Sequence, residues 1–120
     1  MATTVSGTTL TFNDSTTQTT AANPVGVGQT WQNVSASRAI NTNYTNSTGK
    51  AIQVSIQAYY AVNQNAELKV GGITDAFAGW SSYASGAVGG TVTAIVPNGS
   101  TYQYYNVTGT ATTPIWFELR

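Results

Sequence analysis

Four carboxylic acids are the side chains of this sequence best suited to acid–base chemistry, and nothing in their spacing pairs them. They are Asp14, Glu67, Asp75 and Glu118. Hydrolysis of a glycosidic bond requires two carboxyl groups that flank it. The chain has no histidine to act as a general base and no cysteine to act as a nucleophile or metal ligand. We therefore expect no catalytic residues, no metal site and no cofactor.

Arg38 is the charged residue with the most unusual sequence context. It falls on one face of an alternating run with Ala36, Ile40 and Tyr44. A guanidinium among apolar side chains requires a carboxylate or carbonyl partner. Glu118 is the candidate partner for a structural ion pair, in the same chain or in a neighbouring one. The alternative is an arginine at a strand edge whose charged group reaches water.

Aromatic side chains are the other chemical resource of the chain. Tyr59 and Tyr105 alternate to the side opposite the expected core, whereas Trp80 and Tyr83 fall in a stretch rich in Gly, Ser and Ala. Exposed rings beside amides and hydroxyls suit sugars, because they combine apolar area with hydrogen-bonding groups. These four residues are the candidate glycan contacts. The alternative for Trp80 is that it anchors its own loop.

The elements that must position these residues are β-strands. In residues 51–60, apolar and polar side chains alternate with the period of two that a half-buried strand requires. We predict that this strand forms a central hairpin with residues 36–45, around the turn at 46–50. We also predict that residues 91–96 and 101–107 pair across the turn at 97–100, and that 76–90 is a loop. The side chains expected in the core are Ile52, Val54, Ile56, Trp31, Tyr102 and Phe117.

The pattern as a whole predicts an all-β, antiparallel β-sandwich of about seven strands, since no segment has helical spacing. We expect a threonine-rich N-terminal stalk or trimerisation segment at 1–24 and the sandwich domain at 25–120. The first segment has strand propensity but too little apolar content for a core of its own. We therefore predict a homotrimer in which Val5, Leu10 and Phe12 of three copies pack around one axis.

The low charge content of the chain argues against some classes of binding partner. Only 7% of residues are charged and the formal net charge is +0. A nucleic-acid site needs clustered lysine and arginine, so we expect no nucleic-acid partner. The apolar runs are too short to span a bilayer, so we expect no membrane insertion. We also expect no signal peptide at the N-terminus.

Several of these stretches resemble the C-terminal, receptor-binding tip of bacteriophage tail fibres and tail spikes. The matching segments are TLTFNDSTTQTTA (9–21), GQTWQNVSASRAINTNYTNSTGKAIQVSI (28–56), VPNGSTYQYY (96–105) and IWFELR (115–120). The resemblance implies a homotrimeric, extracellular tip at the distal end of a virion appendage. It implies binding to a bacterial surface polysaccharide or lipopolysaccharide, and it fixes no catalytic residues.

Sequence and resemblance together favour a tail fibre tip that binds a host glycan during adsorption. The receptor contact is expected in residues 76–90, which match no part of the family pattern. One alternative is a non-binding structural module that trimerises and caps a tail fibre or depolymerase spike. A weaker alternative is a polysaccharide-cleaving enzyme.

Overall fold

The computed structural model describes residues 7, 9–18, 24–80, 86–110 and 112–120. These residues form ten strands and one short 3-10 helix. The elements are β1 Leu10–Thr11, β2 Thr17–Gln18, β3 Trp31–Asn33, η1 Ser35–Ser37, β4 Tyr44–Thr45, β5 Ile52–Ala61, β6 Gln64–Val70, β7 Ile73–Trp80, β8 Ala87–Val96, β9 Thr101–Thr108 and β10 Ile115–Leu119.

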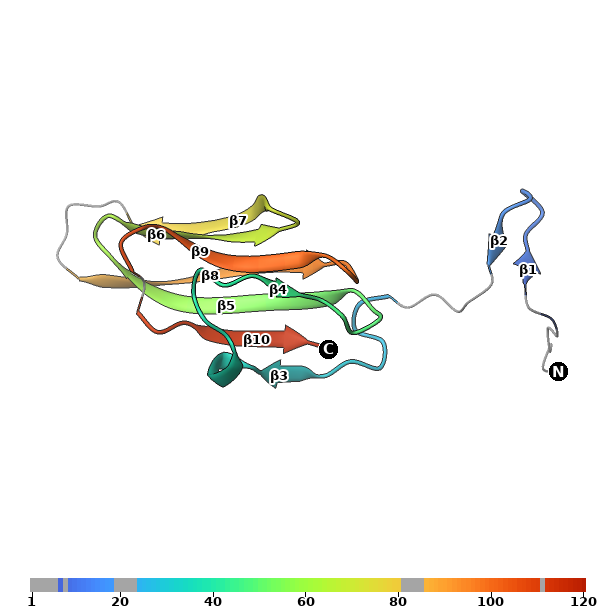
Figure 1. Cartoon of the computed structure of the whole chain (residues 1–120), viewed down its shortest axis with the longest axis horizontal. Coiled ribbons are helices and arrows are strands. Elements are labelled where there is room, and N and C mark those ends of the chain that lie inside the picture. Colours follow the sequence, from blue (N-terminus) through green and yellow to red (C-terminus); the bar gives the residue numbers. More distant parts are fainter. Residues whose placement is uncertain (1–6, 8, 19–23, 81–85, 111) are drawn as a thin grey trace.

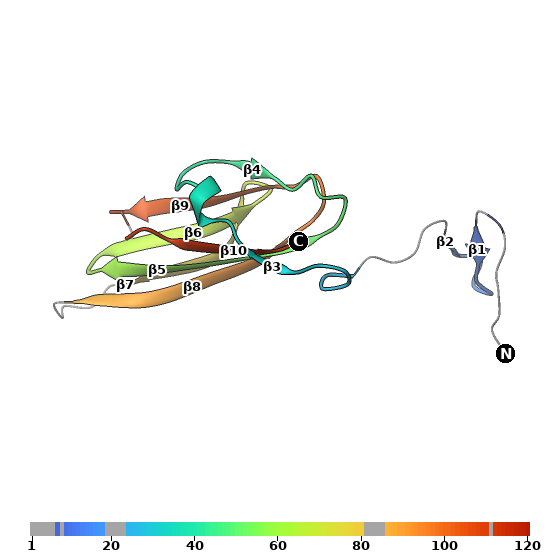
Figure 2. The same ribbon diagram turned by 90° about the horizontal axis from the view of Figure 1, so that it is seen from below.

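Two antiparallel four-stranded sheets stack face to face (Figures 1 and 2). The first has the strand order β3–β10–β5–β8 and is called the β5 sheet here; the second has the order β4–β9–β6–β7 and is called the β6 sheet. From β3 to β10, every connection between successive strands crosses from one sheet to the other except β6–β7, which is a hairpin within the β6 sheet. Eight strands in this order form a jelly roll. The predicted all-β antiparallel sandwich is confirmed.

The core lies between the two sheets and is built by alternation along each strand. Every second residue of β5, from Ile52 to Tyr60, is buried, as the sequence predicts. The phenol oxygens of Tyr60 and Tyr104 form a hydrogen bond inside this core. The buried hydrophobic residues are Ile52, Val54, Ile56, Ala58, Tyr60, Ala66, Leu68, Val92, Ala94, Val96, Tyr102, Tyr104 and Trp116.

Two of the residues expected in the core face outward instead. Trp31 is 51% exposed, and Phe117 is only half-buried. In β10 the inward residues are Trp116 and Glu118, both fully buried. Trp116 fills more of the core than Phe117 could, and the charge of Glu118 is matched by neighbouring cations. The prediction that Phe117 lies in the core therefore assigned the wrong face of this strand to the core.

The predicted central hairpin is wrong. Residues 36–45 contain the end of η1 and a positive φ of 61° at Asn41, so β4 is the only strand in this stretch. β4 pairs with β9 in the β6 sheet rather than with β5. The chain therefore passes from one sheet to the other between β4 and β5. The buried Asn46 stabilises this connection, because its amide nitrogen donates to the carbonyls of Lys50 (2.7 Å) and Val96 (2.9 Å). The turn after Val96 likewise connects the two sheets, so β8 and β9 are not partners.

The predicted loop at 76–90 is wrong at both of its ends, while residues 81–85 lie outside the described residues. Residues 73–80 form β7, which pairs with β6 across a turn at Gly71 and Gly72. Both glycines have positive φ, 59° and 82°, which is the conformation of a tight hairpin turn. β8 begins at Ala87 and pairs with β5 over its whole length. Strand glycines that look like loop residues in the sequence are covered here by tyrosine rings of β5.

The N-terminal strands β1 and β2 form a small hairpin that Figure 1 draws apart from the sandwich. Asp14 closes its turn by accepting hydrogen bonds from the backbone and the hydroxyl of Thr16 (2.9 and 2.6 Å). Leu10 and Phe12 are 39% and 46% exposed, and Val5 lies outside the described residues. The stalk, its boundary at residue 24 and the trimer remain predictions. No helix in the described part of the chain is long and apolar enough to cross a membrane.

Candidate functional site

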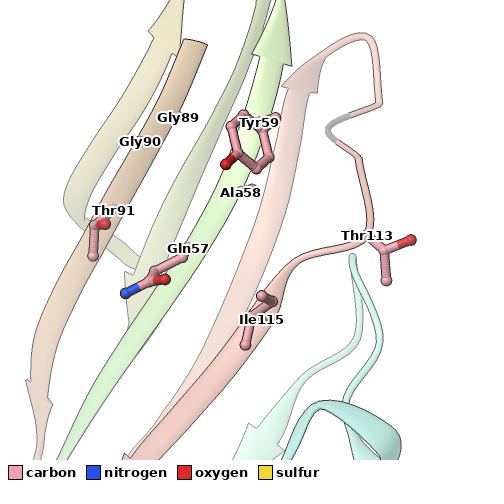
Figure 3. A pocket seen from close by; sticks show the side chains of 8 residues that line it. All are labelled: Gln57, Ala58, Tyr59, Gly89, Gly90, Thr91, Thr113 and Ile115. Atoms are coloured by element: carbon pink, nitrogen blue, oxygen red, sulfur yellow. The ribbon is translucent and has the colours of Figure 1, made fainter. Parts of the chain in front are cut away.

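An open pocket of about 190 Å³ lies on the outer surface of the β5 sheet, near the end of β5 (Figure 3). Three neighbouring strands build it, since Gln57 of β5 stands opposite Thr91 of β8 on one side and Ile115 of β10 on the other. The lining residues are Gln57, Ala58, Tyr59, Gly89, Gly90, Thr91, Thr113 and Ile115.

The alternation of β5 places Tyr59 in this pocket. Because Ala58 and Tyr60 point into the core, Tyr59 points outward, and it is 61% exposed. Its cross-strand partner is Gly89. A Cβ atom at Gly89 would lie 3.4 Å from the Tyr59 ring, so the ring lies against bare backbone of β8. Because Gly89 has no side chain, the Tyr59 ring covers its backbone and forms part of the pocket wall.

The connector between β9 and β10 fixes the backbone of Tyr59 from the other side. The backbone nitrogen of Thr112 donates to the carbonyl of Tyr59 (3.1 Å), and the Tyr59 nitrogen donates to the Thr112 hydroxyl (3.2 Å). This pairing extends the sheet past the start of β10 and brings Thr113 to the pocket wall. The pocket is therefore framed by hydrogen-bonded backbone, which reduces the entropy lost when a ligand binds.

The chemistry of the pocket is polar but uncharged. Gln57 offers an amide, Tyr59 a phenol, and Thr91 and Thr113 offer hydroxyls, while Ile115 adds apolar surface. No lysine, arginine, aspartate or glutamate lines it. Such a lining matches a ligand with hydroxyl groups and an apolar face, such as a neutral sugar ring. It supplies neither a general acid nor a carboxylate nucleophile of the kind that glycosidic cleavage uses.

The four predicted glycan residues do not form one site. Tyr59 lines the pocket, but Tyr105 lies on the outer surface of the β6 sheet, where the Lys69 ammonium is 4.0 Å from its ring centroid. Trp80 is the last residue of β7, and its side chain lies outside the described part of the structure. Tyr83 lies wholly outside the described residues.

Sequence reasoning missed most of the pocket. Gln57 was within reach, because it alternates with Tyr59 on the outer side of the predicted strand. Thr91 also alternates outward along its strand. Gly89 was assigned to a loop, and Ile115 lies on the same face of its strand as Phe117, which was assigned to the core. Their place in the pocket depends on sheet order, which no local pattern in the sequence carries.

Arg38 and Glu118 lie in contact within one chain. Arg38 donates from Nε to Oε1 (2.8 Å) and from Nη2 to Oε2 (3.0 Å), and Arg120 Nη1 donates to Oε2 (2.7 Å). The Tyr102 hydroxyl donates to Oε1 (2.6 Å). The Arg38 guanidinium also lies over the ring of Tyr44, 4.5 Å from its centroid. With Glu118 fully buried and four hydrogen bonds to its carboxylate, the cluster links η1, β9 and β10 and leaves no open position for a substrate.

The remaining described acids are occupied locally or stand alone. Glu67 accepts a hydrogen bond from the Thr74 hydroxyl (2.7 Å) and lies 3.5 Å from the Lys69 ammonium. Asp75 is exposed on β7. Among the residues that the structure describes, no three acidic or other metal-ligating side chains gather into a potential metal site.

Comparison with known proteins adds no assignment, since no protein-family model, no curated protein and no solved structure matches this chain.

Proposed function

We propose that this chain is the receptor-binding tip of a bacteriophage tail fibre and that it holds a neutral sugar of a host surface polysaccharide or lipopolysaccharide in the Tyr59 pocket. One observation carries the binding part. An exposed tyrosine ring lies beside a bare glycine backbone and is surrounded by uncharged hydrogen-bonding side chains. The viral part rests on the resemblance of the sequence to tail fibre tips.

Binding at one such pocket is weak. A sugar offers little apolar area, and each of its hydroxyls must lose water before it can bond to Gln57, Thr91 or Thr113. Useful avidity therefore requires several pockets on one particle. The proposed homotrimer supplies three, which raise the apparent affinity when their spacing matches the repeat of the polysaccharide. This requirement fits a position at the distal, extracellular end of a virion appendage.

An array of bacterial surface glycans tests the proposal with two matched variants. Tyr59→Ala and Tyr105→Ala each remove an exposed, outward-facing tyrosine, but only the first lines the pocket. We expect Tyr59→Ala to weaken binding to neutral glycans about tenfold or more, equivalent to about 1.4 kcal/mol. Tyr105→Ala should bind like the wild type. Loss of binding in Tyr105→Ala alone would move the site to the β6 sheet.

The competing function is a structural module that trimerises and caps a fibre without binding a receptor. Exposed apolar side chains on the same face of the β5 sheet favour it, because they suit contact between protein copies. A wild-type protein that binds neither an arrayed glycan nor host cells, while it remains a stable trimer, would support this function and refute receptor binding.

A further inference from the structure

The kinds of side chain that line the Tyr59 pocket recur in the next row along β5. Each row crosses three strands, with one apolar residue from β10, one polar residue from β5 and one threonine from β8. The pocket row is Ile115, Gln57 and Thr91, and the next row is Phe117, Ser55 and Thr93. The outer face of the β5 sheet therefore presents the same combination of chemical groups at least twice.

The spacing of these rows follows from the geometry of a strand. Residues on one face of a strand are two positions apart, so neighbouring rows are separated by about 7 Å. This separation is similar to the length of one sugar ring in a linear chain. From Tyr59 to Gln53, the outward side chains of β5 extend over about 20 Å. A linear oligosaccharide that lies along β5 would thus place successive sugars against successive rows.

The polar groups of these rows are available to a ligand. Within the described part of the chain, the side chains of Gln53, Gln57 and Thr91 form no hydrogen bonds. The Thr93 hydroxyl lies 3.4 Å from the Ser55 hydroxyl, which is longer than an ordinary bond between two hydroxyls. Both hydroxyls can therefore turn towards a bound sugar at little cost.

No charged side chain belongs to these rows. Arg120 follows the last outward residue of β10, but its guanidinium donates to the buried Glu118 and so belongs to the inner cluster. The outer face of the β6 sheet differs, since it carries the Lys69–Glu67 pair. The rows along β5 consequently offer no counter-charge to the carboxylates or phosphates of an anionic polysaccharide, and they match a neutral one.

The distribution of apolar groups fits a sugar better than a protein partner. The polar side chains of Gln53 and Ser55 separate the apolar residues of β10 from the side chains of β8. The buried centre of a protein interface is more uniformly apolar and aromatic. A sugar ring has small apolar faces edged by hydroxyls, so alternating apolar and polar groups complement it.

We propose that the Tyr59 pocket is the first subsite of a track along β5 that binds a linear, neutral oligosaccharide. The second subsite consists of Phe117, Ser55 and Thr93. There the half-buried Phe117 ring packs against one face of a sugar, and the two hydroxyls bond to the edge of that sugar. The inference rests on the proposed function and adds to it the length and the charge class of the ligand.

Isothermal titration calorimetry of the full chain measures how affinity depends on ligand length. The probes are fragments of one to about six sugars, prepared by mild acid hydrolysis of the neutral glycan that binds most strongly on the array. We expect affinity to rise about tenfold or more from one sugar to about three, because the second subsite adds a ring contact. The rise should end at about four sugars, where the chain has passed Gln53. Added salt should leave the affinity unchanged, since no ion pair forms.

Phe117→Ala tests the second subsite directly. Phe77→Ala is the matched control, because Phe77 is an exposed phenylalanine on the outer face of the β6 sheet. We expect Phe117→Ala to bind a single sugar like the wild type but to lose most of the gain with length. A second variant, Ser55→Ala with Thr93→Val, keeps the ring, removes both hydroxyls and should lose part of the gain. Thermal unfolding checks that each variant is folded.

The outcomes separate the track from the proposed function. The track is refuted when affinity does not rise with length, when both second-subsite variants keep the whole gain, or when Phe77→Ala loses as much of it as Phe117→Ala. In these cases a sugar still binds at Tyr59, so the proposed function stands. The proposed function fails, and the track with it, when no fragment binds or when Tyr59→Ala binds every fragment like the wild type.

Discussion

The buried carboxylate of Glu118 is the residue on which most of the polar chemistry inside the sandwich depends. Its partners Arg38, Arg120 and Tyr102 come from three separate parts of the chain. Removal of one cation leaves a buried charge incompletely matched, which costs much more than loss of an exposed pair.

We expect Arg38→Met to lower the free energy of unfolding by about 3–5 kcal/mol, because Met keeps the apolar stem but removes both hydrogen bonds to Glu118. Lys69→Met is the control. It breaks the more exposed Lys69–Glu67 pair and should cost about 0–1 kcal/mol. Urea unfolding of both variants measures the difference. Equal losses would mean that Arg38 is not needed to hold the Glu118 charge.

The buried tyrosines predict a loss of stability at high pH. Burial, with the hydrogen bond to the negative Glu118, raises the pKa of Tyr102 to about 12, and burial also raises the pKa of Tyr60 and Tyr104. In the unfolded chain these phenols ionise near pH 10. Above that pH the unfolded state loses protons that the native state keeps, so stability present below pH 10 falls as the pH rises towards 12.

The fall should reach about 1.4 kcal/mol per pH unit for each such tyrosine. Urea midpoints between pH 8 and 12 measure it. Tyr102→Phe should start from a lower stability, since it loses the bond to Glu118, but should show a shallower decline above pH 10. An unchanged slope would show that Tyr102 does not contribute to the alkaline transition.

For individual residues, the sequence predicted which side chains interact more accurately than which side chains point into the core. The pairing of Arg38 with Glu118 could be inferred because a buried cation needs an anion and the chain offers few. The orientation of β10 could not. Its outward residues Ile115, Phe117 and Leu119 are as apolar as its inward residue Trp116, so alternation gives the period but not the face.

Among the strands, β8 shows how an element can be built from residues that are poor strand formers. Two adjacent tyrosines of β5 cover two adjacent glycines of β8 on opposite faces of the sheet. Tyr59 lies over Gly89 on the outer face, and Tyr60 lies over Gly90 in the core. The ring of each tyrosine occupies the space that a side chain on β8 would need.

The two glycines should therefore respond differently to the same substitution. A Cβ at Gly90 would lie 2.9 Å from the Tyr60 ring and 3.4 Å from Cβ of Ala78, so Gly90→Ala should cost about 1–3 kcal/mol. Gly89→Ala meets the Tyr59 ring at an ordinary contact distance and should change stability by less than about 0.5 kcal/mol. Thermal and urea unfolding compare them. Equal costs would mean that Tyr60 can move away from Gly90.

Element positions were predicted well for β5 and poorly where the chain changes sheet. Local alternation located residues 51–60, but the connections at Asn46 and at 97–99 cross between sheets and resemble hairpin turns in the sequence. The side chain of Asn46 decides the first crossing through bonds to Lys50 and Val96. The stretch 76–90 is rich in small residues, so in the sequence it resembles a loop. At the start of β8, tyrosine rings of β5 cover two of these small residues and fill the space that larger side chains would take.

At the scale of the whole molecule, the jelly-roll fold does not determine the function, because one such fold serves many functions. The surface residues that the fold brings together are more informative. The strand order brings Gln57, Thr91 and Ile115 into one row beside Tyr59, and it places Tyr105 on the opposite outer face. Of the residues that line the pocket, only Tyr59 was named as a ligand contact from the sequence. The β5 sheet carries an uncharged pocket on its outer face, which suits an assembly that presents several copies of one weak site.

Amide chemical shifts measured during titration with a neutral oligosaccharide selected on the glycan array test the central claim most directly. The account predicts saturable shifts at Gln57, Tyr59, Gly89 and Thr91, with no change around Tyr105. It also predicts that the shifts disappear in Tyr59→Ala while the rest of the spectrum is retained. Shifts confined to the β6 sheet, or none in the pocket at saturating sugar, would contradict glycan binding at Tyr59.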